Sequence, residues 1–369
     1  MKFLDDFRDP ALAEQCTKAI LHLGTGHWKI MEVCGGQTHA IIKNGIDRIL
    51  ADRVTLLHGP GCPVCVTPAE LIDQAVTLAS REDVIFCSFG DMLRVRGGGR
   101  DLLSVKAAGG DVRTLYSPLD CLHIARDNPQ QEVVFFAIGF ETTAPVSACV
   151  VRQACQHGLR NFSILNAHVL IPPAIETILS APQNQVQALL APGHVCSVTG
   201  CAEYERLSIE YGIPIVITGF EPVDILQGIH MAVSQLEQGQ ARMENQYRRV
   251  VQYQGNKAAQ ALVRQVFRVV DRNWRGLGVI PGSGLALREE YEEYDAGKRF
   301  GLAESGAEAS TSCIANMVLQ GRRKPPDCPA FADTCTPERP LGASMVSSEG
   351  ACAAYFRYCR NYKHANVTE

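Results

Sequence analysis

The chain has 369 residues, of which 46% are hydrophobic and 20% charged, and its formal net charge is −4. This balance is ordinary for a globular protein, and it argues against a nucleic-acid partner, because nucleic-acid-binding surfaces usually carry a basic excess. No apolar run approaches the roughly 18 residues that a membrane span requires, and the N-terminus MKFLDDFRDP carries acids where a signal peptide is apolar. We therefore expect a cytoplasmic protein with no membrane partner, long enough for two or three domains.

Seven short apolar runs, rich in β-branched and aromatic residues, are each followed by a glycine-bearing turn and an amphipathic segment. The runs are 29–33, 54–58, 83–90, 112–116, 132–140, 162–166 and 213–220. Because they lack polar alternation, they are typical of strands buried on both faces of a parallel sheet. The segments 68–80, 118–127, 142–158 and 222–238 have the apolar spacing of helices. This alternation predicts an α/β fold with right-handed crossovers.

A weak internal echo, AIGFETT against ITGFEPV, indicates two similar parallel-sheet α/β domains. After about residue 241 the pattern changes to a long helical stretch and then to irregular sequence dense in Gly, Pro and Cys. The predicted boundaries are 1–39 for an N-terminal helix and first strand packing with the C-terminal module, 40–130 for domain I, 131–240 for domain II, and 241–369 for a mainly helical and irregular C-terminal domain.

Cysteine is unusually frequent, with 15 in the chain. In a reducing compartment, the expected uses of so many thiols are metal ligation, redox chemistry and core packing, rather than a disulfide framework. Cys87, Cys149 and Cys155 lie inside strand-like or helical patterns and are interpreted as core packing. The cysteines that follow strands or lie in the C-terminal tail are the candidates for chemistry.

The first cysteine-bearing loop is KIMEVCGGQTHA, in which Cys34 follows a predicted strand and precedes a helix expected to begin near Thr38. Gly35 and Gly36 allow the backbone to approach a ligand closely. His39 is near enough in sequence to polarise or protonate such a ligand. A single cysteine after a strand is buried more often than reactive, so both interpretations stay open for this loop.

The second loop, HGPGCPVCVTPAE, places Cys62 and Cys65 at the carboxyl end of strand 54–58, where open α/β sheets hold their sites. Thr67 is a predicted N-cap of the next helix, and Glu70 completes a capping box. The dipole and free N–H groups of that helix are expected to lower the thiol pKa values. The pair fits a redox couple, half of a metal site or two buried thiols. Two such loops at neighbouring strand ends favour one shared site for a metal such as Fe(II), or for thiol–disulfide exchange.

The tail contains Cys313, Cys328, Cys335 and Cys352, with 14, 6 and 16 residues between successive members. Wide spacing amid Pro and Gly suits an iron–sulfur cluster wrapped by loops. Zinc also accepts four cysteines, but its structural sites usually contain a tight knuckle that these four lack. From spacing alone, a cluster, a zinc site and unliganded thiols remain alternatives, and Cys359 is expected not to be a ligand.

A further stretch, PGHVCSVTGC, offers His194, Cys196 and Cys201 as a candidate metal trio, although core packing at a strand end is the commoner use of such residues. The chain contains no Gly-x4-Gly-Lys-Ser/Thr loop. Nucleotide hydrolysis is therefore not expected.

Long, rare motifs identify a family. At MEVCGGQTHA, HGPGCPVCV, GFETTAP, APGHV, GFEPVDILQG, ENQYRRVV, WRGLGVIPGSG and MVSSEGACAAY, the chain resembles the HypD family of hydrogenase maturation factors, over essentially its whole length. The resemblance implies a scaffold that assembles the Fe(CN)2CO unit of nickel–iron hydrogenases. The implied partners are a small HypC-type chaperone and the cyanide donor HypE, with HypF acting indirectly. The implied fold is two similar α/β domains and a third domain with a 4Fe–4S cluster.

The resemblance also implies roles for single residues. Cys34 matches the thiolate that binds the transient Fe(II) carrying CN and CO ligands, shared with the N-terminal cysteine of the HypC-type partner. Cys62 and Cys65 match an essential redox pair, and the implied 4Fe–4S ligands are Cys313, Cys328, Cys335 and Cys352. The remaining residues in the family's cleft motifs are His39, Glu141 and Thr142.

Two departures from the family pattern limit these expectations. The usual first motif is Cys-Gly-Gly-His-Thr-His, whereas this chain has Gln37 at the first His, so that position does not need a titrating imidazole. Some members carry a second cysteine pair near the cluster, and this chain has Ala315 and Ser344 at those positions, so an electron relay through such a pair is not expected.

Two other classes of protein fit the same residues. One is an autonomous thiol–disulfide reductase in which the cluster feeds electrons to Cys62 and Cys65. The other is a structural zinc protein. Whether the chain is an enzyme or an assembly scaffold with thiol redox activity is left open by the sequence.

Overall fold

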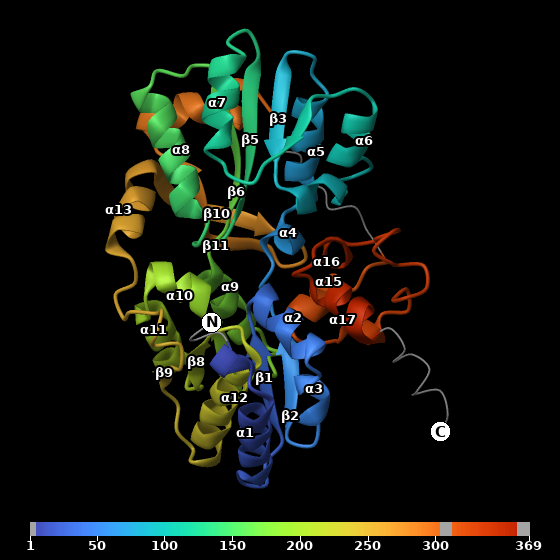
Figure 1. Cartoon of the computed structure of the whole chain (residues 1–369), viewed down its shortest axis with the longest axis vertical. Helices are drawn as coiled ribbons and strands as arrows, with labels where there is room; N and C mark the ends of the chain where they lie inside the picture. Colours follow the sequence, from blue (N-terminus) through green and yellow to red (C-terminus); the bar gives the residue numbers. More distant parts are fainter. Residues whose placement is uncertain (1–4, 303–311, 360–369) are drawn as a thin grey trace. The chain divides into compact units, whose positions relative to one another are not determined.

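The computed structural model describes residues 5–302 and 312–359, which divide into two compact units (Figure 1). Within the described residues, unit 1 comprises 5–62, 174–256 and 312–359, and unit 2 comprises 63–173 and 257–302. Both units are discontinuous in sequence, unlike the continuous domains expected over 40–130 and 131–240. Parts of the predicted segments 1–39 and 241–369 lie outside the described residues.

Unit 1 is built on a five-stranded parallel sheet with the order β2-β1-β7-β8-β9. Its strands are β1 (Trp28–Glu32), β2 (Val54–His58), β7 (Ala188–Pro192), β8 (Ile215–Thr218) and β9 (Met243–Asn245). The chain moves from β1 to β2 on one side, whereas β7 pairs with the other side of β1. The strand order therefore reverses at β1, and the carboxyl ends of the strands at such a reversal are where open α/β sheets bind ligands.

Helices cover the sheet of unit 1. They are η1 (Asp5–Arg8), α1 (Pro10–His22), α2 (Gly35–Lys43), α3 (Ile46–Ile49), α9 (Ile171–Leu179, which crosses the unit boundary), α10 (Gly193–Thr199), α11 (Ala202–Tyr211) and α12 (Pro222–Glu237). One core joins Ile30, Leu56 and Leu190 of the sheet to Ile41 of α2 and Ile229 of α12. Helix α1 runs beside α12 (Figure 1). The sequence had predicted instead that the N-terminal helix packs with the C-terminal module.

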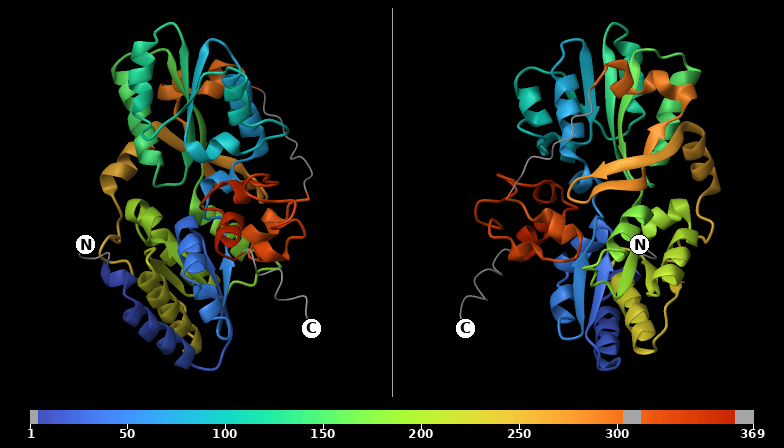
Figure 2. Two further views of the ribbon diagram at one scale, coloured as in Figure 1. Left: turned by 45° about the vertical axis from the view of Figure 1, so that its right-hand side comes forward. Right: turned by 180° about the vertical axis from the view of Figure 1, so that it is seen from behind.

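The C-terminal segment 312–359 packs on unit 1 through short elements. They are α15 (Ala315–Leu319), η4 (Pro325–Asp327), α16 (Ala343–Val346) and α17 (Ala351–Cys359). Phe331, Met345 and Tyr355 belong to the same hydrophobic core as Ile30 and Ile41, and both views in Figure 2 show the segment beside α2. The tail is therefore not a separately packed module, because its apolar side chains complete the core of the first sheet.

Unit 2 is built on a four-stranded parallel sheet with the order β4-β3-β5-β6. Its strands are β3 (Val84–Ser88), β4 (Val112–Thr114), β5 (Glu132–Gly139) and β6 (Phe162–His168). All five residues of β3 and seven of the eight in β5 are buried, which is why these runs show no polar alternation. The strand order reverses between β3 and β5, so this sheet also has a reversal point at its carboxyl edge.

An antiparallel hairpin extends unit 2. Strands β10 (Phe267–Trp274) and β11 (Gly278–Leu287) pair with each other, and the Leu170 N–H donates to the Ser283 carbonyl at 2.9 Å just after β6. The helices of this unit are α4 (Pro63–Val66), α5 (Ala69–Ala79), η2 (Gly90–Arg94), α6 (Leu102–Ala107), α7 (Asp120–Asp127), α8 (Ala144–Gln156), α13 (Lys257–Val266), η3 (Glu289–Tyr294) and α14 (Ala296–Arg299).

The predicted fold class is confirmed: two parallel-sheet α/β parts and a mainly helical and irregular C-terminal region. All seven predicted strands form. The sequence patterns missed β7, β9 and the hairpin, and the long helix expected from about 241 is confined to Lys257–Val266. The Arg-Val-Val run after it pairs with β11 instead, because cross-strand packing overrides a weak helical pattern.

The predicted capping box at the start of α5 is wrong. Pro68 occupies the N-cap position without a side-chain cap. The Thr67 hydroxyl donates instead to the Pro63 carbonyl at 2.9 Å, because the turn of α4 immediately before it offers that acceptor. Glu70 accepts a hydrogen bond from the Asn273 side chain. Among the described residues, no helix has both the length and the apolar character that a membrane crossing needs.

Candidate functional site

Cys34 lies at the reversal point of the sheet in unit 1, between the end of β1 and the start of α2. Its backbone N–H donates to the Glu32 carboxyl group at 2.8 Å, and its Sγ lies 3.5 Å from Nδ1 of His194. His194 opens α10 directly after β7, the strand beside β1. Two neighbouring strands therefore end in a thiol and an imidazole that face each other, which is a soft-plus-borderline donor set for a metal ion.

The loop before Cys62 is hydrogen-bonded to the Cys34 loop and packs closely against its backbone. The Gly35 N–H donates to the Gly61 carbonyl at 2.8 Å. A Cβ at position 61 would lie 2.2 Å from the Cys34 nitrogen, so only glycine permits this approach. Cys62 and Cys65 are joined in a disulfide. The Cys34 loop therefore contacts the loop that leads into Cys62, and one shared site for the three sulfurs stays a prediction.

The Cys34 thiol is nearly enclosed, with 2% of the residue exposed. Burial raises its pKa, and the charges of Glu32 and Glu349 raise it further, against the lowering effect of the backbone N–H groups of Gln37 and Gly36. At this cysteine, desolvation therefore outweighs the pKa-lowering effect of the N–H groups at the helix start. A bound cation reverses that balance, because it stabilises the thiolate directly.

A buried polar chain runs from the Cys34 loop to helix α17. The Glu32 carboxyl group accepts from the Thr38 hydroxyl and contacts His58 Nδ1 at 2.8 Å. The other ring nitrogen of His58 lies 3.1 Å from the Tyr355 hydroxyl. Tyr355 comes one helical turn after Cys352. The geometry of the Cys34 loop is therefore coupled through hydrogen bonds to the helix that carries a tail cysteine.

His39 packs on α17. Its Nε2 lies 3.1 Å from the Tyr358 hydroxyl, and the two rings meet edge to face. Burial lowers the pKa of His39. Gln37 is fully buried, and its amide donates to the Ala191 carbonyl and the Thr218 hydroxyl. Position 37 therefore supplies its two hydrogen bonds from an uncharged amide group.

The sequence patterns missed Glu32, His58 and the pairing of His194 with Cys34. The stretch PGHVCSVTGC had offered His194 as a candidate metal ligand, but together with Cys196 and Cys201 instead of Cys34. Cys196 and Cys201 are buried in the core. In the described ranges, no three His, Cys, Asp or Glu side chains gather tightly enough to hold one metal ion.

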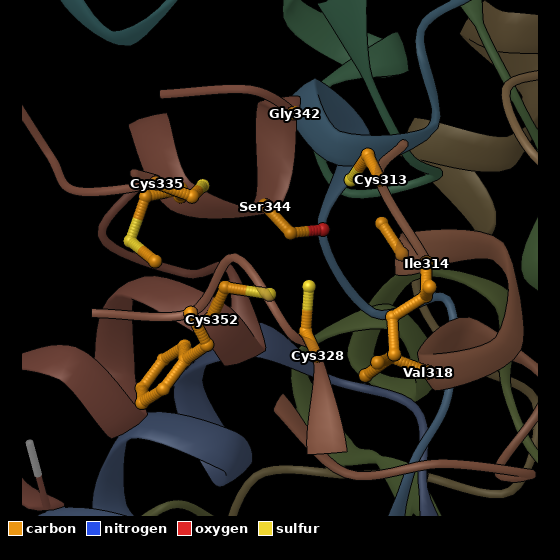
Figure 3. Close-up of a pocket in the computed structure, with 11 residues that line it drawn as sticks. Cys313, Ile314, Val318, Cys328, Cys335, Gly342, Ser344 and Cys352 are labelled. Carbon is orange, nitrogen blue, oxygen red and sulfur yellow. The ribbon is translucent and has the colours of Figure 1, made fainter. Parts of the chain in front are cut away.

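The four tail cysteines line one cavity in unit 1. Figure 3 shows the side chains of Cys328 and Cys352 directed into this space, with Cys313 and Cys335 on its rim. Burial and the proximity of the other three thiols raise the pKa of Cys352. The Leu341 N–H points at the Cys335 sulfur, 3.4 Å away. Cys359 is buried outside the cavity lining.

This donor set fits a 4Fe–4S cluster better than a single ion. Four thiolates around one zinc lie about 2.3 Å from the metal, and hence only about 3.8 Å from one another. A cubane instead takes one thiolate at each of four irons, so its ligands surround a volume, as these four cysteines do. Among the other described residues around the cavity, Ser344 is polar. The apolar ones are Ile314, Ala315, Val318, Phe331, Gly342 and Met345.

Glu141 and Thr142 belong to unit 2, where they follow β5 at the reversal point of that sheet. The Glu141 carboxyl accepts from the Ile171 N–H at 2.9 Å, and burial raises its pKa to about 7. Thr142 is half-buried. Nearby, burial lowers the pKa of His168 to about 3, with a further contribution from the charge of Arg272. Unit 2 thus holds a carboxyl group that titrates near neutrality at a ligand-binding position of its fold.

Comparisons with known proteins agree with the sequence motifs. The family model for HypD, described as "Hydrogenase formation hypA family", matches residues 11–359. The chain is 46% identical over 370 residues to the hydrogenase maturation factor HypD of Rhodobacter capsulatus, covering 97% of this chain and 98% of that relative. It is 47% identical over 370 residues to HypD of Azotobacter vinelandii, covering 98% and 97%. It is 45% identical over 369 residues to HypD of Escherichia coli K12, covering 97% and 98%.

Proposed function

Because the chain belongs to the HypD family of hydrogenase maturation factors, we propose that it is the scaffold on which the Fe(CN)2CO unit of nickel–iron hydrogenases is assembled. The iron is cargo, bound by the Cys34 thiolate together with a cysteine of a HypC-type chaperone. Cyanide arrives from a HypE-type donor, which HypF serves indirectly. The cytoplasm is the proposed compartment, since iron ligation requires Cys34 to be reduced.

The observation that carries this proposal is the surrounding of Cys34. Its sulfur lies at the strand-order reversal, 3.5 Å from His194, and beside the loop that leads to a cysteine pair. The Glu32 carboxyl group accepts a hydrogen bond from the Cys34 backbone N–H, and this bond fixes the position of the loop that carries the thiol. A cysteine that only fills a core needs neither the imidazole neighbour nor the carboxyl anchor.

The Cys62–Cys65 pair is proposed to exchange electrons during assembly. Its disulfide shows that the two sulfurs are close enough to bond. Oxidation of the dithiol forms one S–S bond and releases two electrons and two protons, and the reverse step consumes them. The same disulfide is what favours the second candidate function, an autonomous thiol–disulfide reductase. Steady-state reduction of a protein disulfide by the isolated chain would support that alternative.

Cys313, Cys328, Cys335 and Cys352 are the residues that would hold a 4Fe–4S cluster, which supplies one-electron transfer when bound. Their apolar cavity walls would exclude water from it. Iron and sulfide analysis of the anaerobically purified chain tests this assignment: about four of each per chain, with a brown colour, supports it, and a colourless zinc protein contradicts it.

The iron site is tested with Cys34→Ala in the complex with a HypC-type chaperone. We expect the variant to fold and keep its iron–sulfide content, but to lose the infrared bands of bound cyanide and carbon monoxide. Cys16→Ala is the matched control, because Cys16 is a half-buried thiol of α1 in the same unit, and it should keep the bands. Bands that persist in Cys34→Ala would refute the site, and their absence from the native complex would refute the function.

A further inference from the structure

The cavity that the four tail cysteines line contains one side chain whose chemistry the proposed function does not use. Ser344 has the only nitrogen- or oxygen-bearing side chain among the described residues that line it. The residue is 3% exposed, and Figure 3 shows its hydroxyl directed into the cavity between Cys313 and Cys328.

The rest of that described lining is thiol or apolar. A buried hydroxyl without a partner costs free energy, and buried polar groups in folded proteins are nearly always satisfied by protein, water or a ligand. An apolar cavity is a poor place for a lone water, which needs two to four polar partners. An occupant of the cavity is therefore the expected acceptor for the Ser344 hydroxyl.

The backbone holds Ser344 firmly in place. The Met345 N–H bonds to the Gly342 carbonyl at 3.0 Å. The Ser344 carbonyl packs so tightly on Gly350 that a Cβ there would lie 2.2 Å from it. Gly350 immediately precedes α17, which carries Cys352. The hydroxyl is thus fixed relative to a proposed cluster ligand, and it can rotate only about its own side-chain bond.

We propose that Ser344 donates a hydrogen bond to a sulfur of the cluster and thereby raises its reduction potential, an inference that rests on the cluster assignment made above. Sulfur in a cluster carries negative charge, and that charge increases when the cluster accepts an electron. A donated hydrogen bond is therefore stronger in the reduced state, and hydrogen bonds to cluster sulfurs are one of the levers by which proteins set potentials. Ser344 is a positioning residue here, not a ligand.

The test is a potentiometric titration of the anaerobically purified full-length protein, followed by the electron paramagnetic resonance signal of the reduced cluster. In Ser344→Ala, we expect the ratio of reduced to oxidised cluster, at the native midpoint potential, to fall about tenfold, which is about 59 mV for a one-electron couple. Ser347→Ala is the matched control. Ser347 is buried at the end of the same short helix, and its hydroxyl accepts from the Glu349 N–H at 3.2 Å outside the cavity lining.

Ser344→Cys provides a second comparison, because a thiol is of similar size but a weaker donor, so its shift should be in the same direction and smaller. A change of less than about twofold in Ser344→Ala, or an equal shift in Ser347→Ala, would overturn the proposal. Loss of the cluster from both Ser344 variants would also overturn it, since a tuning residue is not needed for assembly. If the native protein itself contains no iron and sulfide, the cluster assignment is wrong, and the proposed role of Ser344 is then wrong as well.

Discussion

Gly61→Ala is the sharpest probe of the contact between the two cysteine loops. An added Cβ would lie 2.2 Å from the Cys34 nitrogen, 2.5 Å from the Cys34 Cα and 2.6 Å from the Val33 carbonyl carbon. All three are backbone atoms, so no side chain can rotate away. The Cys34 loop must therefore move by about 1 Å to restore an ordinary contact distance, taking the sulfur with it.

The cost of this displacement can be estimated from the structure. Overpacking of a closed interior costs about 1–3 kcal/mol, and weakening the bond from the Gly35 N–H to the Gly61 carbonyl adds about 1 kcal/mol. We expect Gly61→Ala to destabilise unit 1 by roughly 2–4 kcal/mol. A shift of about 1 Å at a reacting group lowers rates by the order of 10²-fold, so the loading of cyanide-bearing iron should fall far more than the stability alone explains.

The assay combines thermal unfolding with infrared detection of cyanide and carbon monoxide on the complex with the HypC-type chaperone. Gly99→Ala is the control, because its added Cβ meets nothing within 4 Å, and it should behave as the native chain does. Native stability together with native infrared intensity in Gly61→Ala would refute the reasoning, since the loops would then not need to touch.

Two further substitutions test buried carboxyl groups. Burial raises the pKa of Glu141 from its usual 4.5 to about 7, so the folded protein favours the protonated carboxyl group. The contribution of Glu141 to stability is therefore full below about pH 4.5 and is lost as the pH rises through 7. Glu141→Gln should therefore be more stable than the native chain by about 3 kcal/mol at pH 8 and by less than about 1 kcal/mol at pH 5, and a pH-independent difference in thermal unfolding would contradict this. Glu32→Gln should destabilise the protein by at least about 2 kcal/mol, because an amide cannot accept from Cys34, Thr38 and His58 together. The exposed Glu14→Gln is the control, and it should leave the melting temperature nearly unchanged, because exposed ion pairs contribute little to stability. Equal melting shifts in the two variants would show that the Glu32 chain does not stabilise the fold.

Local sequence was enough to predict seven of the strands and the places where their cysteine loops begin. A buried parallel strand must be apolar on both faces, and a ligand loop needs glycine where two backbones approach closely. Both requirements are therefore visible in a short stretch of sequence. Cys34, Cys62 and Cys65 were predicted from such loops, whereas the four tail cysteines were predicted from their spacing. The same local reasoning wrongly predicted Thr67 as a helix N-cap and a long helix after 241. The Thr67 hydroxyl bonds to the preceding turn instead, and part of the predicted helix pairs with β11.

Sequence patterns alone therefore predicted seven of the strands, the loops that carry thiols, and the family to which the motifs belong. Only the tertiary structure decided which sheet each strand joins, that His194 meets a thiol 160 positions earlier, and that the tail completes the first core. The physical reason is that pairing between distant segments depends on shape and burial shared by both partners. Neither segment carries that information alone, whereas a strand or a turn is specified by its own side chains.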